Sequence, residues 1–121
     1  MEWTVLLDDD FASWLYEQES GVRIAITAVA NTLKTLGPVL GRPQVDTLKG
    51  SNLPNLKELR VQYQGVPWRV LFVFDPKRQA ILLVGGTKQG NPRWYKTAIP
   101  LAEKRYQRHL AALEKAHGKK T

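Results

Sequence analysis

The chain has 121 residues, of which 43% are hydrophobic and 24% are charged, and it contains no cysteine. This length and composition suit a single globular domain, 1–121, with a core of its own. The lack of cysteine excludes disulfides, thiolate zinc sites and cysteine nucleophiles. No apolar run is long enough to cross a membrane and no signal-peptide pattern opens the chain, so we expect a cytoplasmic protein without membrane contact.

The net charge of +7 is spread unevenly along the chain. Residues 1–46 contain seven acidic and three basic side chains, which give −4, whereas residues 47–121 contain four acidic and fifteen basic ones, which give +11. A basic region on one part of a fold is typical of proteins that bind polyanions, most often nucleic acid. A solvated basic surface, or one that meets an acidic protein, would give the same pattern.

The first third of the chain predicts a strand and two helices. Residues 2–7 form a short β candidate that would join a larger sheet, and the run Asp8, Asp9, Asp10 favours the start of a helix over 11–18. Ser20 is placed to cap the second helix, whose apolar residues recur at steps of three and four: Val22, Ile26, Val29, Leu33 and Leu36. Two successive helices predict a helical hairpin packed on a sheet, followed by a long polar connector over 37–55.

Residues 53–90 form the stretch around which the chain is organised. Three β-type segments are separated by two short turns that contain proline, at 64–67 and 75–78, and this pattern predicts an antiparallel meander. The first segment alternates, with Leu59 and Val61 on one face and Glu58 and Arg60 on the other. The next two segments, 68–74 and 80–86, are apolar on almost every residue, as expected of strands that are covered on both faces.

Arg69 is the lone charge in the second segment. If Tyr63 and Trp68 flank the turn, strand pairing places Arg60 opposite Leu71, and Arg60 and Arg69 become diagonal neighbours about 7–8 Å apart on one face. Two guanidinium groups on one face need an anion between them, such as phosphate, or carboxylates that pair with them, such as Glu58. Alternatively, an acidic residue of the N-terminal helices forms a salt bridge with Arg69 and so holds the fold together.

The last part of the chain predicts a basic loop and a helix. Residues 87–96 combine three bases with two aromatics, a pattern that suits a nucleic acid backbone with a stacked base. We expect Trp94 to pack against the helix, while the role of Tyr95 stays open. Pro100 fits the first turn of this helix, whose buried stripe comprises Ile99, Ala102, Tyr106, Leu110 and Leu113.

No metal site is expected. Asp8, Asp9 and Asp10 have no second acidic cluster or histidine to complete a hard-cation site, because such sites need several oxygen ligands. His109 and His117 have no acidic partners at the spacing of a zinc site. His109 lies beside the buried stripe of the last helix, where a histidine is usually a packing residue.

The predicted order β-α-α-β-β-β-α resembles the RelE/HigB (Gp49-like) toxins of bacterial type II toxin–antitoxin systems, in the RelE/ParE superfamily. The motifs that carry this resemblance are residues 48–50, 56–60, 68–72, 81–86, 88 and 93–96, followed by 100–102. The resemblance implies an α+β fold, in which an N-terminal strand and a helical hairpin pack on a small antiparallel sheet with a C-terminal helix. This is the RelE-like microbial RNase fold.

The resemblance also implies an activity and partners. Such toxins cut messenger RNA in the decoding site of a translating ribosome, without metal or cofactor. The 2′-hydroxyl attacks the adjacent phosphate and leaves a 2′,3′-cyclic phosphate, a reaction that needs a base, cations and an acid for the leaving 5′-oxygen. The implied partner is a small antitoxin with a helix-turn-helix DNA-binding fold, which would cover the basic face or dock on the helices.

The residues that match the family's catalytic positions are Arg60, Arg69, Lys88, Arg93 and Tyr95. The resemblance implies that Arg60 and Arg69 bind phosphate and stabilise the charge of the transition state. It implies that Lys88 and Arg93 bind phosphate or protonate the leaving oxygen, and that Tyr95 stacks on a base or transfers a proton. Further RNA-binding candidates are Lys49, Lys57, Lys96 and His109. The family often has two bases where this chain has Lys88 followed by Gln89, so the acid and the base stay open.

Two other functions compete with RNA cleavage. A ParE-like toxin on the same fold would inhibit DNA gyrase by protein contact, although such relatives generally lack the cluster of catalytic bases. A phage-derived, non-catalytic module would bind nucleic acid with a steep salt dependence and would cleave nothing.

Overall fold

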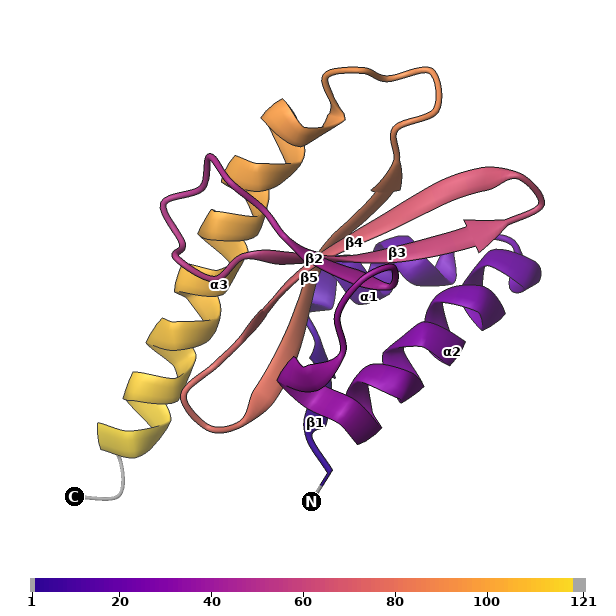
Figure 1. Cartoon of the computed structure of the whole chain (residues 1–121). Helices are drawn as coiled ribbons and strands as arrows, with labels where there is room; N and C mark the ends of the chain where they lie inside the picture. The colour runs from indigo at the N-terminus through magenta and orange to yellow at the C-terminus, as the bar shows by residue number, and fades with distance from the viewer. Residues whose placement is uncertain (1, 119–121) are drawn as a thin grey trace.

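The computed structural model describes residues 2–118, with side chains up to 116. Figure 1 shows three layers: a five-stranded sheet lies between the helix pair α1 and α2 on one face and the long helix α3 on the other. The elements run in the order β1 (Thr4–Leu7), α1 (Asp9–Tyr16), α2 (Ser20–Leu36), a 3-10 turn (Gly37–Val39), β2 (Val45–Thr47), β3 (Lys57–Tyr63), β4 (Val66–Phe74), β5 (Gln79–Thr87) and α3 (Trp94–Gly118).

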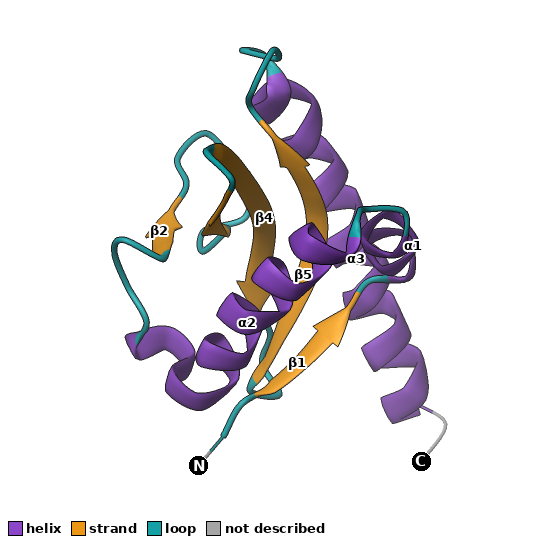
Figure 2. Ribbon diagram, turned by 90° about the vertical axis from the view of Figure 1, so that its right-hand side faces the viewer, coloured by secondary structure: helices purple, strands orange, loops and turns teal. Residues whose placement is uncertain are grey.

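The sheet has the strand order β1-β5-β4-β3-β2. The meander β3–β4–β5 is antiparallel as predicted, and β1 joins its far edge in parallel with β5, from Thr4 opposite Gln79 to Leu7 opposite Leu82. Figure 2 shows β1 beside β5 with α2 across the sheet. The expected fold class is therefore confirmed, with a parallel pair added to the antiparallel meander.

One strand was not predicted. The connector over 37–55 contains β2, which pairs antiparallel with β3 and places Val45 opposite Leu59. Three residues with a single buried apolar side chain, Val45, are too short a segment for a pattern of period two to be recognised. The strand matters because it brings Asp46 next to the polar face of β3.

The register predicted for β3 and β4 is wrong by two residues. Gln64 and Gly65 have φ of 49° and 77° and form a two-residue hairpin turn, so Val66 and Pro67 already belong to β4. Arg60 therefore lies directly opposite Arg69 rather than opposite Leu71. The prediction that both arginines share one face is confirmed.

Two hydrophobic cores hold the layers together. The core under α1 and α2 takes Leu59 and Val61 from β3, and the core under α3 takes Leu71 and Val73 from β4. Strand β4 also contributes Val70 and Phe72 to the first core, so it is covered on both faces as predicted. The polar side of β3 consequently faces α3.

The helix starts differ in part from the prediction. The Asp8 side chain caps α1, because Oδ2 accepts hydrogen bonds from the amides of Asp10 and Phe11 at 3.0 and 3.1 Å. Ser20 is the first residue of α2 rather than its cap, a position that Glu19 holds. Helix α3 begins at Trp94, so Pro100 lies inside it and not in its first turn. None of the described helices is long and apolar enough to span a bilayer.

Two glycines bring the layers close together. A Cβ on Gly85 would lie 2.3 Å from the Trp14 ring, and one on Gly86 would lie 2.4 Å from the Trp94 ring. Each tryptophan therefore rests directly on the backbone of β5, one on each face. Trp94 is buried as expected, but it is the first residue of α3 and packs on β5 instead of packing against the helix from the preceding loop.

Candidate active site

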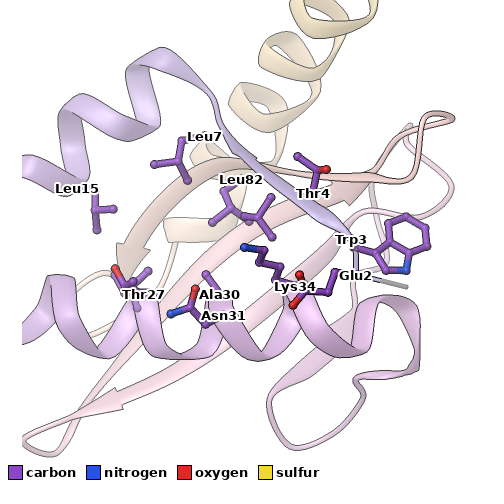
Figure 3. Close-up of a pocket in the computed structure, with 12 residues that line it drawn as sticks. Glu2, Trp3, Thr4, Leu7, Leu15, Thr27, Ala30, Asn31, Lys34 and Leu82 are labelled. Atoms are coloured by element: carbon purple, nitrogen blue, oxygen red, sulfur yellow. The ribbon is translucent and has the colours of Figure 1, made fainter.

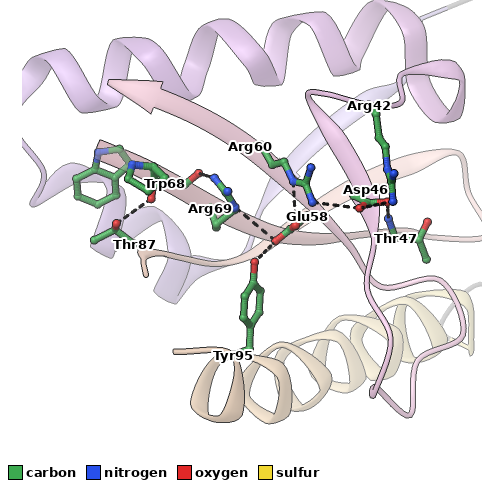
Figure 4. A network of polar contacts seen from close by, with 10 residues as sticks. Arg42, Asp46, Thr47, Glu58, Arg60, Trp68, Arg69, Thr87 and Tyr95 are labelled. Carbon is green, nitrogen blue, oxygen red and sulfur yellow. Dashed lines mark hydrogen bonds and ion pairs between the residues drawn. The ribbon is translucent and has the colours of Figure 1, made fainter. Parts of the chain in front are cut away.

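The carboxylate of Glu58 contacts both arginines. Glu58 lies two residues before Arg60 on the same face of β3, and its side chain is 3% exposed. Its Oε2 accepts a hydrogen bond from Arg60 Nε at 3.1 Å, and its Oε1 lies 3.7 Å from Arg69 Nε (Figure 4). The salt-bridge partner of Arg69 is thus on β3, so the expectation of a partner on the N-terminal helices is wrong.

A second carboxylate holds Arg60 from β2. Asp46 Oδ2 accepts from Arg60 Nη2 at 3.1 Å and lies 3.1 Å from Arg42 Nη2. Its hydrogen bond with Arg42 keeps the pKa of Asp46 below its ordinary value, so this carboxyl stays ionised. Two carboxylates and three guanidinium groups therefore form one continuous network.

The two opposed arginines border an open depression of about 400 Å³, lined by Pro43, Gln44, Arg60, Gln62 and Arg69. Arg69 Nη1 donates to the Trp68 carbonyl at 3.0 Å. Arg69 Nε is buried, and within the described part of the chain it has no hydrogen-bond partner. That nitrogen faces Glu58, whereas the Arg60 side chain is 35% exposed. A guanidinium group at the wall of an open depression is suited to bind an anion.

Tyr95 joins the network from the first turns of α3. Its hydroxyl donates to Glu58 Oε1. Burial and the hydrogen bond to Glu58 raise the pKa of Tyr95 to about 12. At neutral pH the residue is therefore a phenol that holds its proton. Lys88 Nζ lies 5.3 Å from the centre of the Tyr95 ring, so the loop before α3 adds a cation at this point.

The other predicted residues fall into three groups. Arg93 is exposed one residue before α3, and Lys49 and Lys96 line a second depression that also contains Tyr95. Lys57 lies on the opposite face of β3, where its Nζ donates to Thr47 Oγ1 at 2.9 Å. His109 lies about 21 Å further along α3 than Tyr95.

His109 and Asp75 form a structural pair. His109 Nε2 lies 2.8 Å from Asp75 Oδ2, in the turn between β4 and β5. Although burial opposes it, hydrogen bonds from His109 and Gln79 lower the pKa of Asp75 below its ordinary value. This pair fastens α3 to the far end of the sheet and stands apart from the arginines.

Glu58 is the site residue that the sequence reasoning used least. The sequence predicts Glu58 as one possible partner for the arginines, but not as the residue that joins them to Tyr95. Alternation along β3 places Glu58 and Arg60 on one face, but Tyr95, which contacts Glu58 from α3, follows it by 37 residues. The alternation of polar and apolar residues therefore predicts the face of β3 on which Glu58 lies, and no sequence pattern predicts its contact with Tyr95.

A larger depression, of about 500 Å³, lies elsewhere in the fold. Figure 3 shows it between β1 and α2, lined by residues such as Trp3, Leu7, Leu15 and Leu82. Glu2 and Lys34 are the charged side chains in its lining. Across the described residues, moreover, no three His, Cys, Asp or Glu side chains gather where they could hold a metal ion. Of the predicted site residues, the structure brings Arg60, Arg69 and Tyr95 together around Glu58.

Comparisons with known proteins agree on a family. A family model described as phage-derived protein Gp49-like matches residues 13–107. The proposed toxin HigB3 of Mycobacterium tuberculosis is 42% identical over 109 residues, which cover 89% of this chain and 94% of that protein. This chain belongs to the Gp49-like family of HigB-like toxins.

Two further comparisons fit the Gp49-like assignment. The proposed toxin HigB2 of Mycobacterium tuberculosis is 41% identical over 105 residues, and this chain spans about half of it, 52%. A double arginine-to-alanine mutant of the Escherichia coli toxin RelE, in the free state, matches with a TM-score of 0.62 over 87% of this chain and 98% of that one. At 13% identity the RelE match supports the fold alone, and together these findings confirm the expected family and fold.

Proposed function

We propose that this Gp49-like protein is the toxin of a type II toxin–antitoxin system and that it cleaves messenger RNA on the translating ribosome. The observation that carries the proposal is the direct pairing of Arg60 with Arg69 across β3 and β4, at the wall of an open depression. Guanidinium groups present paired donors that match the geometry of a phosphate. The Arg60 side chain is 35% exposed at this wall, so a ligand in the depression can reach it.

The proposed reaction is an internal transfer at one phosphate of the RNA. The 2′-oxygen forms a bond to phosphorus and loses its proton, while the bond from phosphorus to the 5′-oxygen breaks and that oxygen gains a proton. The product is a 2′,3′-cyclic phosphate. Arg60 and Arg69 stabilise the negative charge that builds up on the phosphate oxygens, which is the step where fixed cations contribute most.

Tyr95 acts in this proposal as a neutral group. Because its pKa is raised to about 12, it does not serve as a base near neutral pH. It positions Glu58, which in turn positions both arginines. Lys88 beside the Tyr95 ring and the exposed Arg93 are the candidates for binding the RNA backbone or protonating the leaving oxygen.

The partners follow from the same family. We propose that a small antitoxin with a helix-turn-helix DNA-binding fold neutralises the protein in the cytoplasm. The ribosome would present the messenger RNA in its decoding site. No metal ion is required for this reaction, because cations from the protein supply the positive charge.

Primer extension on a defined messenger RNA tests the proposal. The purified protein is incubated with the RNA, with and without programmed ribosomes, as wild type, Arg69→Ala and Lys77→Ala. We expect discrete cuts that require ribosomes, a loss of about 10²-fold or more in rate for Arg69→Ala, and full activity for Lys77→Ala. Lys77 is an exposed residue of the turn between β4 and β5, so its substitution matches the change in charge far from the site.

Other outcomes would point to other functions. Cuts on free RNA would indicate a ribonuclease that works without the ribosome. No cuts in either reaction, together with double-strand breaks in treated cells, would indicate a gyrase toxin. Circular dichroism of Arg69→Ala must match the wild type, so that lost activity reports on chemistry and not on unfolding.

A further inference from the structure

A second depression adjoins the candidate site at Tyr95. It measures about 280 Å³ and is formed where the loop after β2 meets the start of α3. The loop contributes Lys49, Gly50 and Asn52, and the helix contributes Tyr95, Lys96, Ile99, Pro100 and Glu103. Tyr95 thus lines this depression while its hydroxyl binds Glu58 between the two arginines.

Glu103 is hydrogen-bonded to the loop at the wall of this depression. Its Oε2 accepts from Ser51 Oγ at 2.7 Å and from the Asn52 amide at 2.5 Å. Within the described residues, Oε1 has no such partner. The loop therefore fixes one carboxylate oxygen and leaves the other as an ordered acceptor.

The remaining lining has two kinds of side chain. Lys49 and Lys96 are exposed cations, and Ile99 and Pro100 provide an apolar wall. A simple phosphate would be repelled by Glu103, and a purely apolar ligand would not match two lysines. The lining thus offers the Glu103 acceptor, two lysines and an apolar wall. A flat, partly apolar group that has hydrogen-bond donors and is attached to a phosphate matches all three.

We propose that this depression binds a nucleobase of the RNA next to the phosphate that the arginines hold, and that Glu103 Oε1 selects bases with an exocyclic amino group. The inference rests on the proposed function, since it places the base beside the phosphate site. Adenine, cytosine and guanine each carry an amino group that can donate to a carboxylate, whereas uracil does not. Lys49 and Lys96 attract the phosphate backbone of the RNA, and Glu103 discriminates against uracil.

Backbone amide NMR with nucleoside 5′-monophosphates tests this inference. AMP, CMP, GMP and UMP are titrated separately into the full chain. We expect AMP, CMP and GMP to shift the signals of Gly50, Asn52 and Ile99, with UMP binding about threefold to tenfold more weakly because one charged hydrogen bond is missing.

Glu103→Gln is the informative variant, with Glu114→Gln as its control. If the glutamine oxygen keeps the bonds to Ser51 and Asn52, its amino group faces the depression and replaces an acceptor with a donor. The preference against UMP should then vanish or reverse. Glu114 is exposed on the same helix and outside the depression, so its variant should behave as the wild type.

Two results would overturn the inference. In one, no nucleotide perturbs Gly50, Asn52 or Ile99, and the depression is a gap where the loop rests on α3. In the other, all four nucleotides bind equally in the wild type and in Glu103→Gln. If either of these NMR results is found together with ribosome-dependent cleavage, the proposed function is supported and the proposed base site is wrong. Amino-base preference without any cleavage would keep the site and remove the endoribonuclease.

Discussion

Glu58 is the residue on which the arrangement of the arginines depends. Like charges directly opposite each other in a sheet repel, and Arg60 and Arg69 occupy such positions. The Glu58 carboxylate faces both, and Tyr95 donates to the same group from α3. Removing any member leaves a buried charge or a buried acceptor without its partner, which costs more than the contact itself contributes.

Tyr95→Phe tests this dependence. The change removes the donor to Glu58 and leaves the ring in place, and we expect it to lower the free energy of unfolding by about 1–3 kcal/mol. Urea titration at neutral pH measures the loss. Tyr16→Phe is the control, because Tyr16 is 76% exposed and its substitution should change stability by less than about 0.5 kcal/mol. Equal stability of wild type and Tyr95→Phe would contradict the role given to this hydroxyl.

The wild type should also lose stability in alkali. The pKa of Tyr95 is raised from 10.0 to about 12 in the folded state, so the folded chain holds this proton more tightly than the unfolded chain. The stabilisation is complete below pH 10 and is lost as the pH rises toward 12. In Tyr95→Phe this part of the alkaline decline should be missing.

At the scale of residues, the sequence predicts which face of the sheet carries the two arginines, but it does not predict the side-chain contacts made there. Alternation along β3 and the lone charge of β4 place Arg60 and Arg69 together, because both signals are local. The exact pairing was missed since Pro67 suggested a turn, whereas the turn is formed by Gln64 and Gly65 with positive φ. The contact of Tyr95 with Glu58 joins distant elements, and no local pattern encodes it.

At the scale of elements, α1 and α3 are positioned by the glycines of β5. Gly85→Ala would place a Cβ 2.3 Å from the Trp14 ring, and we expect a loss of about 1–3 kcal/mol in stability. Gly41→Ala is a matched control, since its Cβ meets no atom within 4 Å. Thermal unfolding of both variants compares them directly. If Gly85→Ala proved as stable as the control, the close packing of Trp14 on β5 would not matter.

The far end of α3 depends on the pair of His109 and Asp75. Asp75→Asn removes a buried charge that accepts hydrogen bonds from His109 and Gln79, and should lower stability at pH 7 by about 1.5–3 kcal/mol. Because the pKa of Asp75 is lowered in the folded state, its contribution is present above pH 3.8 and is lost as the pH falls through the folded value.

Urea titrations at pH 7 and at pH 3 check this prediction. The difference between wild type and Asp75→Asn should shrink at the lower pH. Asp9→Asn, at an exposed position in the first turn of α1, controls for the general effect of losing a carboxylate. A difference that stays constant with pH would mean that the charge of Asp75 contributes nothing.

Long elements with a clear period were predictable, and short or terminal ones were not. The apolar seam of α2 and the alternation of β3 extend over enough residues to be unambiguous. Strand β2 has three residues, and its pairing depends on the neighbouring β3. Pro100 favours a first turn, so the sequence predicts too late a start for α3. In the structure the amides of Trp94 and Lys96 already donate to the carbonyls of Asn91 and Arg93.

At the scale of the whole molecule, part of the basic charge is paired with carboxylates of the same chain. Arg108 binds Asp8 and Asp10 of α1 at 2.6 and 3.0 Å, and Arg60 is held by Asp46 and Glu58. The exposed cations that remain around Tyr95 are Lys49, Lys88, Arg93 and Lys96. The net charge of the sequence therefore overstates the positive charge that is available to bind RNA. The location of most basic residues in the second part of the chain still indicates where the RNA would bind.

Salt dependence of RNA binding separates the two kinds of cation. For a single-stranded RNA the slope of log affinity against log salt changes by about 0.7 for each phosphate contact. The double variant Lys88→Ala, Arg93→Ala should reduce this slope by about 1.4. Arg108→Ala should leave it unchanged, because Arg108 is engaged with α1. Fluorescence anisotropy across a potassium chloride series measures both, and equal slopes would contradict the assignment.

The parallel pairing of β1 with β5 has a consequence for the order in which the chain folds. Thr4 pairs with Gln79, 75 residues later, whereas β3, β4 and β5 are joined by short turns. Closing so long a loop is slower than forming adjacent hairpins, because more chain entropy is lost before any contact forms. The hairpin that holds Arg60 and Arg69 therefore assembles early. We expect β1, which comes before every other strand of the sheet in the chain, to be among the last elements to dock.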